Sequence, residues 1–229
     1  NTVADFLQGM FNPMTRSLII QGLKETLYMV GLSLVLSELI GIPLGITLVI
    51  TRPNHLWPCR LLNQLLGTIV NIGRSIPFII LLVAIIPFTR RIVGTSIGTA
   101  AAMVPLTVAA IPFVARLVES SLLEVDDGVI EAAQAMGASK WQIIWKVLLP
   151  EALPSLMLGA TITAINLIGY SAMAGAVGGG GLGDLAVRYG YHRFRADIML
   201  ATVLVLVVLV QVLQAVGNKL ASRLDHRSR

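Results

Sequence analysis

Long apolar stretches separated by short polar segments dominate this sequence. Five stretches reach the length of about 20 residues that a helix needs to cross a bilayer. They lie at residues 22–50, 63–88, 96–115, 153–177 and 198–217. The pattern predicts an all-α integral membrane protein with five transmembrane helices.

Residues 126–150 form a mostly polar island between the third and fourth apolar stretches. Within it, apolar residues recur at i, i+3, i+4 and i+7, which predicts a short helix with one apolar face. This face consists of Val129, Ala132, Ala133 and Met136, with Glu131 and Gln134 opposite. We expect Gly137 to end the helix, because glycine tolerates the left-handed conformation found at many helix ends.

A second short helix is predicted to follow in the same island. Ser139 and Gln142 have the spacing of a capping box, in which two side chains satisfy backbone N–H groups at a helix start. The apolar stripe of this helix consists of Trp141, Ile144, Trp145 and Leu148. We expect the helix to stop at Pro150, which has no N–H and disfavours helical geometry in the residue before it. The island is therefore predicted to be a helical hairpin with an exposed turn.

The composition agrees with a membrane protein and gives a modest indication of its orientation. Of the 229 residues, 55% are hydrophobic and only 13% are charged, against roughly 25% charged in soluble domains. Nine of the 17 Lys and Arg residues fall on the side of the hairpin and the C-terminus, and seven fall opposite. The positive-inside rule then places the hairpin and the C-terminus in the cytoplasm and the N-terminus outside. The net charge of +5 shows no basic stripe with interleaved aromatics, so no nucleic-acid partner is expected.

The sequence contains no pattern of a catalytic, cofactor or metal site. The single cysteine, Cys59, can form neither an internal disulfide nor a metal cluster. Gly178 to Gly183 match G-x-G-x-x-G literally, but they follow a membrane-type stretch instead of the strand that a dinucleotide fold requires. Without a phosphate-binding loop of its own, the chain is expected to be no enzyme and to take its energy from a partner or an ion gradient.

The fourth apolar stretch is more polar than its neighbours. Asn166, Tyr170, Ser171 and Met173 lie on it. Such residues either let membrane helices pack closely or line a translocation path, and both interpretations stay open. The glycine run that follows permits irregular backbone, which is tolerated at membrane depth only against protein or a water-lined cavity.

Two charged residues and three prolines stand inside the predicted spans. Glu38 and Arg74 each lie roughly 17 Å from the predicted cytoplasmic helix ends, at 1.5 Å per residue. Because isolated charges are costly there, we expect them to form an ion pair. The alternative is a proton-carrying carboxylate at Glu38. The Ile-Pro-Phe triplets at Pro77, Pro87 and Pro112 predict bends that are either hinges or fixed shapes.

The hairpin also carries a family resemblance. Glu131-Ala132-Ala133, then Gly137, then Pro150 have the spacing of the EAA loop in the membrane subunits of bacterial ABC importers, which the segment resembles. Residues 71–78, 93–98 and 169–177 are further similar to the permease subunit of methionine ABC importers. The resemblance runs from about residue 22 to residue 215.

This resemblance implies a function and a set of partners. It implies an N-terminal segment at 1–21, an importer transmembrane domain at 22–215 with its coupling loop at 126–150, and a basic cytoplasmic tail at 216–229. The implied activity is import of L- and D-methionine across the bacterial inner membrane by a non-catalytic subunit. The implied partners are a second copy of the chain, two ATP-binding cassette subunits that hold ATP and Mg²⁺, an extracytoplasmic methionine-binding protein or lipoprotein, and the lipid bilayer.

The resemblance also implies roles for particular residues. The residues implied to couple to the ATPase are Glu131, Ala132, Ala133, Gly137, Trp141, Trp145 and Pro150. In the family, the methionine at the position of Met173 is associated with closing the pore between two subunits, and Asn166, Tyr170 and Ser171 are expected near it. Three alternatives stay open: another small amino acid or an osmolyte as substrate, a proton-coupled secondary transporter that uses Glu38, and a hairpin that lies flat on the lipid surface.

Overall fold

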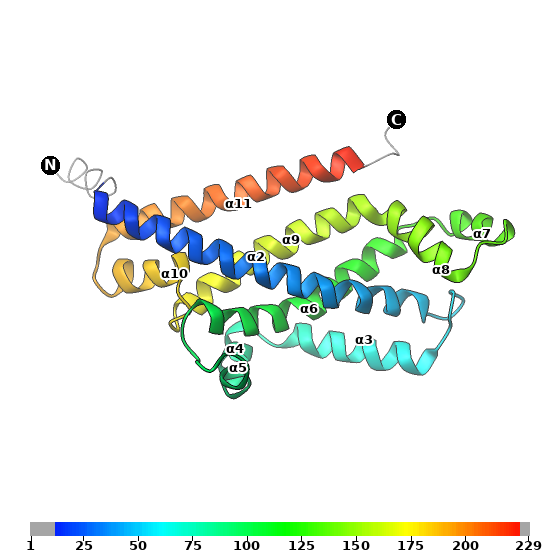
Figure 1. The fold of residues 1–229 in the computed structure, drawn as a ribbon, viewed down its shortest axis with the longest axis horizontal. Helices are drawn as coiled ribbons and strands as arrows, with labels where there is room; N and C mark the ends of the chain where they lie inside the picture. The colour runs from blue at the N-terminus through cyan, green and yellow to red at the C-terminus, as the bar shows by residue number, and fades with distance from the viewer. Residues whose placement is uncertain (1–11, 225–229) are drawn as a thin grey trace. The chain divides into compact units, whose positions relative to one another are not determined.

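The computed structural model describes residues 12–224, and every regular element in that range is a helix (Figure 1). The predicted all-α fold is therefore confirmed. The helices are α2 (Pro13–Ile50), α3 (Arg60–Ser75), α4 (Phe78–Ala84), α5 (Ile86–Val93), α6 (Thr99–Leu123), α7 (Asp127–Ala135), α8 (Lys140–Ile143), the π-helical η1 (Ile144–Leu148), α9 (Leu149–Gly175), α10 (Gly181–Leu185), the π-helical η2 (Ala186–Tyr191) and α11 (Ala196–Leu224).

Four helical stretches are long and apolar enough to cross a membrane: α2, α6, residues 140–175 and α11. The pair α3 and α4 gives a fifth if it counts as one broken span. The predicted span over residues 63–88 is bent by 99° between α3 and α4, next to Pro77, where a bend was predicted. Pro77 has an extended conformation, with ψ of 134°, and precedes the first residue of α4. Since proline cannot donate to the helical ladder, the chain breaks there.

Several predicted borders fall inside longer helices. Helix α2 begins at Pro13, so residues 13–21 belong to it, and residues 1–11 lie outside the described range. Helix α11 ends at Leu224, which places Lys219 and Arg223 on it, while Arg227 and Arg229 lie outside that range. Pro87 stands in the first turn of α5, so it begins a helix and does not end a span.

Helix α6 also runs eight residues beyond its predicted end at residue 115, to Leu123. Its charged residues are partnered. Arg116 forms an ion pair with Glu119 one turn further on and donates a hydrogen bond to the side-chain oxygen of Asn71. Pairing offsets part of the cost of placing these charges on an otherwise apolar helix, so the helix continues through them.

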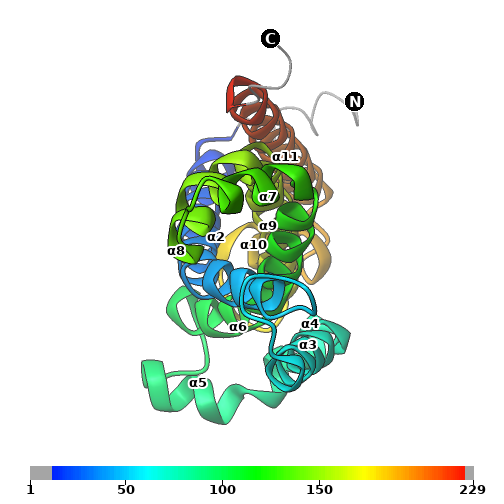
Figure 2. The same ribbon diagram turned by 90° about the vertical axis from the view of Figure 1, so that its right-hand side faces the viewer.

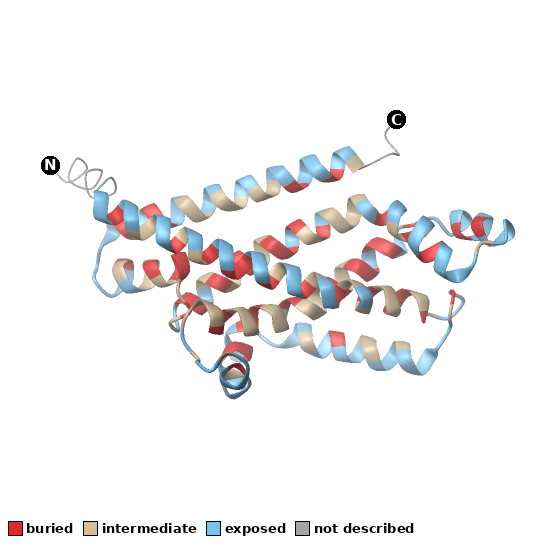
Figure 3. Cartoon of the chain, in the orientation of Figure 1, coloured by how far each residue is buried: buried red, intermediate tan, exposed pale blue. Residues whose placement is uncertain are grey.

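The chain forms two compact units. Unit 1 comprises the described parts of Asn1–Leu36, Ile76–Ala109 and Ala164–Leu213; unit 2 comprises those of Ser37–Ser75, Ala110–Thr163 and Gln214–Arg229. Unit 2 holds the hairpin, and Figure 2 shows α7 and α8 there next to the end of α2. Its core joins α2, α6, the hairpin and η1 through buried apolar side chains, among them Val49, Val114, Val118, Leu122, Ile130, Ile143 and Leu148 (Figure 3).

Two glycines set the distance between α2 and α6 in unit 2. A Cβ at Gly41 would stand 2.6 Å from Val114, and one at Gly45 would stand 2.6 Å from Val118. Glycines one turn apart let membrane helices approach closely, which increases van der Waals contact. This pair therefore fixes α2 against α6 on the side from which the hairpin extends.

In unit 1 the glycine run after α9 forms an irregular turn. Gly178, Gly180 and Gly181 have positive φ values of 87°, 79° and 77°. The backbone N–H of Gly181 donates to the Glu25 carboxylate at 2.7 Å, and that of Leu182 donates to the Thr26 hydroxyl at 2.9 Å. Both acceptors lie on α2, so the turn is fixed to that helix within unit 1.

Candidate functional site

The first helix of the hairpin, α7, begins and ends through local hydrogen bonds. The Asp126 side chain accepts from the backbone N–H of Gly128 at the start of the helix. At its end Gly137 has a φ of +81°, and its N–H donates to the carbonyl oxygen of Gln134 at 2.9 Å. The prediction that Gly137 ends this helix is confirmed.

The second helix, α8, begins with the predicted capping box. The Ser139 hydroxyl accepts from the Gln142 N–H at 3.3 Å, and the Gln142 side-chain oxygen accepts from the Ser139 N–H at 2.8 Å. Each residue satisfies a backbone donor that would otherwise lack a partner at the helix start. The turn between α7 and α8 is thus defined on both sides.

The predicted stop at Pro150 is wrong. Helix α8 passes into the π-helical turn η1, and α9 follows directly from Leu149. The Leu149 N–H donates to the carbonyl of Ile144, five residues back. The helix is thus π-helical directly before Pro150, which has no N–H to donate. Residues 140–175 are therefore one continuous helix, which joins the hairpin to the fourth span without a break.

The two predicted apolar stripes divide between the core and the surface. Ala133 of α7 is buried together with Ile130, and Ile144 and Leu148 are buried on the other helix. The remaining members of the stripes point outward. Met136 is 82% exposed, Trp141 62% and Trp145 63%. The first stripe therefore places one of its four residues against the core and the second places two, because an exposed hairpin has only one inner side.

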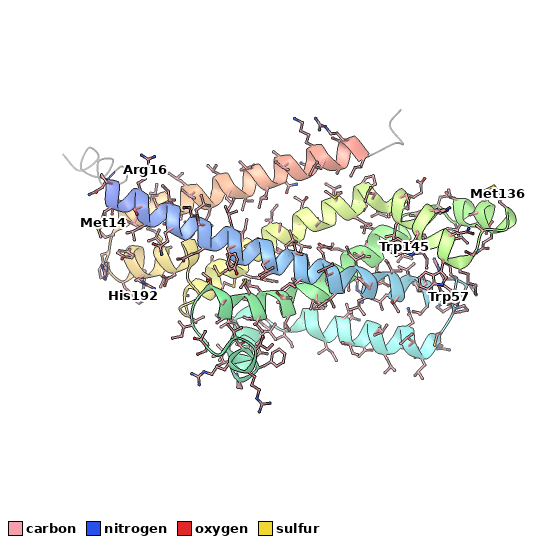
Figure 4. The ribbon with its side chains drawn as sticks, in the orientation of Figure 1. Met14, Arg16, Trp57, Met136, Trp145 and His192 are labelled. Atoms are coloured by element: carbon pink, nitrogen blue, oxygen red, sulfur yellow. The ribbon has the colours of Figure 1, made fainter. Side chains whose placement is uncertain are left out.

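We call five exposed apolar residues of the hairpin the docking face: Val129, Ala132, Met136, Trp141 and Trp145. Figure 4 labels Met136 and Trp145 among them. Glu131, Gln134 and Gly137 are also exposed. Methionine and aromatic residues are enriched where proteins contact one another. The docking face thus has the chemistry of a protein interface.

The loop between α2 and α3 supports this face, although no sequence pattern singled it out. The rings of Trp57 and Trp141 meet edge to face, with centroids 5.4 Å apart, and the Lys140 ammonium lies 5.4 Å from the centre of the Trp57 ring. Aromatic pairs of this kind contribute about 0.5–1.5 kcal/mol beyond the area that they bury. The signal in the sequence that could have pointed to this loop is Trp57 followed by Pro58 in a polar segment.

The loop also holds a partly buried histidine. Burial lowers the pKa of His55 below its ordinary value of 6.5, while the nearby Asp127 carboxylate raises it and Arg52 lowers it. The Nδ1 atom of His55 is buried without a hydrogen-bond partner. The imidazole is therefore held neutral at physiological pH.

The four predicted pathway residues lie on α9 in unit 1 but do not share one environment. Ser171 is buried and donates to the carbonyl of Ile168 at 2.7 Å, while the Tyr170 ring stacks on Phe78 at 4.6 Å between centroids. These contacts favour the packing interpretation for both. Asn166 is half-buried, and Met173 is 48% exposed. Met173 is the member of the set best placed to meet another surface.

The glycine run borders an open cavity of about 690 Å³ in unit 1. Its polar lining includes Gln21 and Glu25 of α2, Asp184 of α10 and Arg188 of η2. Arg188 and Asp184 form an ion pair at 2.7 Å. This polar surface supports the expectation that irregular backbone here lies against a water-lined cavity.

The predicted ion pair between Glu38 and Arg74 is wrong. The ion pairs within residues 12–224 include Arg116–Glu119, Arg188–Asp184 and Arg195–Asp197, and none joins Glu38 to Arg74. Glu38 instead lines a cavity of about 10 Å³ between α2, α6 and α9, beside Ser121 and Thr163. Arg74 is exposed in the last turn of α3, where a positive charge is favourable. Glu38 and Arg74 were predicted at equal depth, but two side chains at equal depth meet only if both helices are rotated to face each other.

A family model described as "Binding-protein-dependent transport system inner membrane component" matches residues 39–229. The chain belongs to this family. The match includes the whole hairpin. The resemblance inferred from the hairpin motif is confirmed.

The chain is similar in sequence to methionine transport permeases over most of its length. It is 54% identical over 227 residues to "Probable D-methionine transport system permease protein MetI" of Vibrio cholerae, which covers 99% of both chains. It is 45% identical over 203 residues to "Methionine import system permease protein MetP" of Bacillus subtilis, covering 89% of this chain and 91% of the relative.

The fold is also similar to that of solved ABC transporter structures. An inward-facing structure of the MetNI methionine ABC transporter matches 94% of this chain and 99% of its own, with a TM-score of 0.92 and 52% identity. An amino acid ABC transporter solved with histidines matches with a TM-score of 0.70 at 19% identity, which shows a shared fold alone.

Proposed function

We infer that the chain is the permease subunit of an ATP-driven importer that carries methionine across the bacterial cytoplasmic membrane. The observation that carries this proposal is 54% identity over 99% of both chains to a relative named for D-methionine transport. The similarity to the membrane subunit of a methionine ABC transporter, with a TM-score of 0.92, supports the same assignment. Both L- and D-methionine are expected substrates.

The permease is a non-catalytic part of that importer, and a separate ATPase hydrolyses ATP. ATP and Mg²⁺ are expected on that partner. The exposed Trp141 and Trp145 support a docking role, since buried tryptophans often dominate the energy of protein interfaces. The alternative is a hairpin that lies flat on lipid, with its apolar residues in the bilayer surface and Glu131 and Gln134 toward water.

The continuous helix at residues 140–175 suggests how the ATPase drives transport. Closure of two ATPase subunits on ATP would draw two docked hairpins together. Because α8, η1 and α9 follow one another without a break, the movement of the hairpin is proposed to pass along this helix into the fourth span. The exposed Met173 on the same helix is proposed to open or close the path beside a second permease copy.

The complete importer is proposed to contain two permease copies, two ATPase subunits and an extracytoplasmic methionine-binding protein. The hairpin and the C-terminus face the cytoplasm, and the N-terminus lies outside. The test is uptake of labelled methionine by proteoliposomes that contain the permease and its ATPase, with the binding protein and with ATP on the appropriate sides. Uptake of another amino acid or of an osmolyte in preference to methionine would overturn the substrate assignment.

The same vesicles test the proton-coupled alternative, which the partly buried Glu38 without an ion pair keeps open. We expect the permease alone to take up no methionine under an imposed proton gradient. We also expect Glu38→Gln to retain ATP-driven uptake. Gradient-driven uptake by the permease alone, abolished by Glu38→Gln, would instead establish a secondary transporter.

A further inference from the structure

Two consecutive side chains of the loop between α2 and α3 pack on the hairpin. We call these residues, Leu56 and Trp57, the brace. Leu56 is 4% exposed and packs in the same core cluster as Ile130 of α7 and Ile143 of α8. Trp57 meets the ring of Trp141, and the Lys140 ammonium lies over the Trp57 ring. The brace therefore joins the loop to both hairpin helices.

Hydrogen bonds fix the other side of the loop to the end of α2. The Trp57 N–H donates to the Ile50 carbonyl at 2.9 Å, and the Cys59 N–H donates to the Thr51 carbonyl at 3.0 Å. From α3, the Asn63 side chain donates to the Leu48 carbonyl at 2.6 Å and to the Thr51 hydroxyl at 3.0 Å. The loop is thus bonded to α2 at several points, which makes it a stiff connection and not a slack tether.

We propose that the brace transmits movement of the hairpin to the cytoplasmic end of α2, as a second mechanical connection beside the continuous helix at residues 140–175. The proposal rests on the docking function of the hairpin. Well-packed groups move together because pulling them apart opens a cavity in a dense core. A hairpin displaced by its ATPase partner must therefore carry Leu56 and Trp57 with it, and the bonded loop then carries the end of α2.

Trp57 is the residue on which this transmission depends most. Its ring contacts the first two residues of α8, Lys140 and Trp141, and its backbone N–H donates to the carbonyl of the last residue of α2. Removing its ring takes one neighbour from Trp141 but keeps every residue of the docking face. A Trp57 variant can therefore separate ATPase docking from transmission to α2.

The single cysteine of the chain provides a natural reporter for the experiment. Cys59 is exposed and stands two residues after the brace. A spin label on Cys59 gives one distance between the two permease copies of the assembled importer. A second reporter, Gln134→Cys in a Cys59→Ser background, gives the corresponding distance for the hairpin. Both distances are measured by pulsed electron paramagnetic resonance, without nucleotide and with the ATPase trapped in its closed state.

In the parent importer we expect both distances to change on closure. With Trp57→Ala, the change at residue 134 should persist and the change at Cys59 should fall to less than half. Uptake of methionine per ATP hydrolysed should fall about tenfold while the rate of hydrolysis is retained. Trp57→Phe, which keeps an aromatic ring, should restore both readouts. If Trp57→Ala does not assemble, Trp57→Leu takes its place with the same expectation.

The proposal is overturned if Cys59 does not move in the parent while residue 134 does, or if Cys59 moves fully with Trp57→Ala. Failure of the docking function gives a different result. In that case residue 134 itself does not move on closure, and the brace falls together with the function on which it rests.

Discussion

Replacing Gly137 tests whether the turn of the hairpin is needed for coupling. Gly137 has a φ of +81°, and a Cβ added there would meet nothing within 4 Å. The cost of a substitution therefore comes from the backbone alone. A residue with a Cβ loses roughly 1–2 kcal/mol in the left-handed conformation. This corresponds to a factor of about 5–30 in the population of the native turn relative to its competitors.

The order of effects follows from the same reasoning. Asn tolerates the left-handed region best among residues with a Cβ, Ala tolerates it less, and the β-branched Val least. We expect uptake of methionine per ATP hydrolysed to fall in the order Gly137→Asn, Gly137→Ala, Gly137→Val. The assay is reconstituted vesicles in which uptake and phosphate release are measured together.

Gly94 provides a matched control. It also has a φ of +81° and open space around its missing Cβ, but it ends α5 in unit 1, away from the hairpin along the chain. Gly94→Ala carries a similar backbone cost and should leave coupling unchanged. Equal uncoupling by Gly94→Ala and Gly137→Ala, or normal coupling by Gly137→Val, would refute the role of the turn.

Three further predictions address docking, packing and pH. Trp145→Ala should weaken binding of the ATPase by about thirtyfold, or 2 kcal/mol, because a tryptophan at the centre of an interface contributes that much. Affinity for the ATPase is measured in detergent, and an unchanged affinity would place Trp145 outside the interface. Gly45→Ala should lower the melting temperature, because its Cβ would stand 2.6 Å from Val118 and overpacking costs about 1–3 kcal/mol. Gly31→Ala on the same helix has open space around its Cβ and should leave the melting temperature unchanged. The third concerns His55, whose pKa is lowered in the folded protein. As pH falls below about 6.5, the unfolded chain takes up this proton before the folded one does, so acid lowers the stability of the fold. His55→Gln should therefore lose less thermal stability between pH 7.5 and pH 5.5 than the parent. An equal loss in both would show that the pKa of His55 does not differ between the folded and unfolded states.

The local features of the hairpin were predictable because short-range chemistry determines them. Ser139 and Gln142 form their capping box with each other, and Gly137 ends α7 through its own backbone freedom. Neither feature requires a partner far away in the sequence. Residue types and spacing therefore sufficed.

The wrong predictions each involve information that a local pattern lacks. Pro150 does not stop the second helix, because a π-turn placed before it removes the need for its N–H. Glu38 and Arg74 lie at similar depths but face different neighbours, since helix rotation depends on packing. The brace was missed because its partners are about 70–90 residues away in the sequence, and only the folded unit 2 brings them together.

Uptake into vesicles shows whether this chain forms the methionine path of an ATP-driven importer. Vesicles with the permease, its ATPase and its binding protein are supplied with labelled methionine and with or without ATP. We expect accumulation that requires ATP, requires the ATPase and is lost in Gly137→Val. Accumulation by the permease alone, or none with the complete assembly, would contradict it.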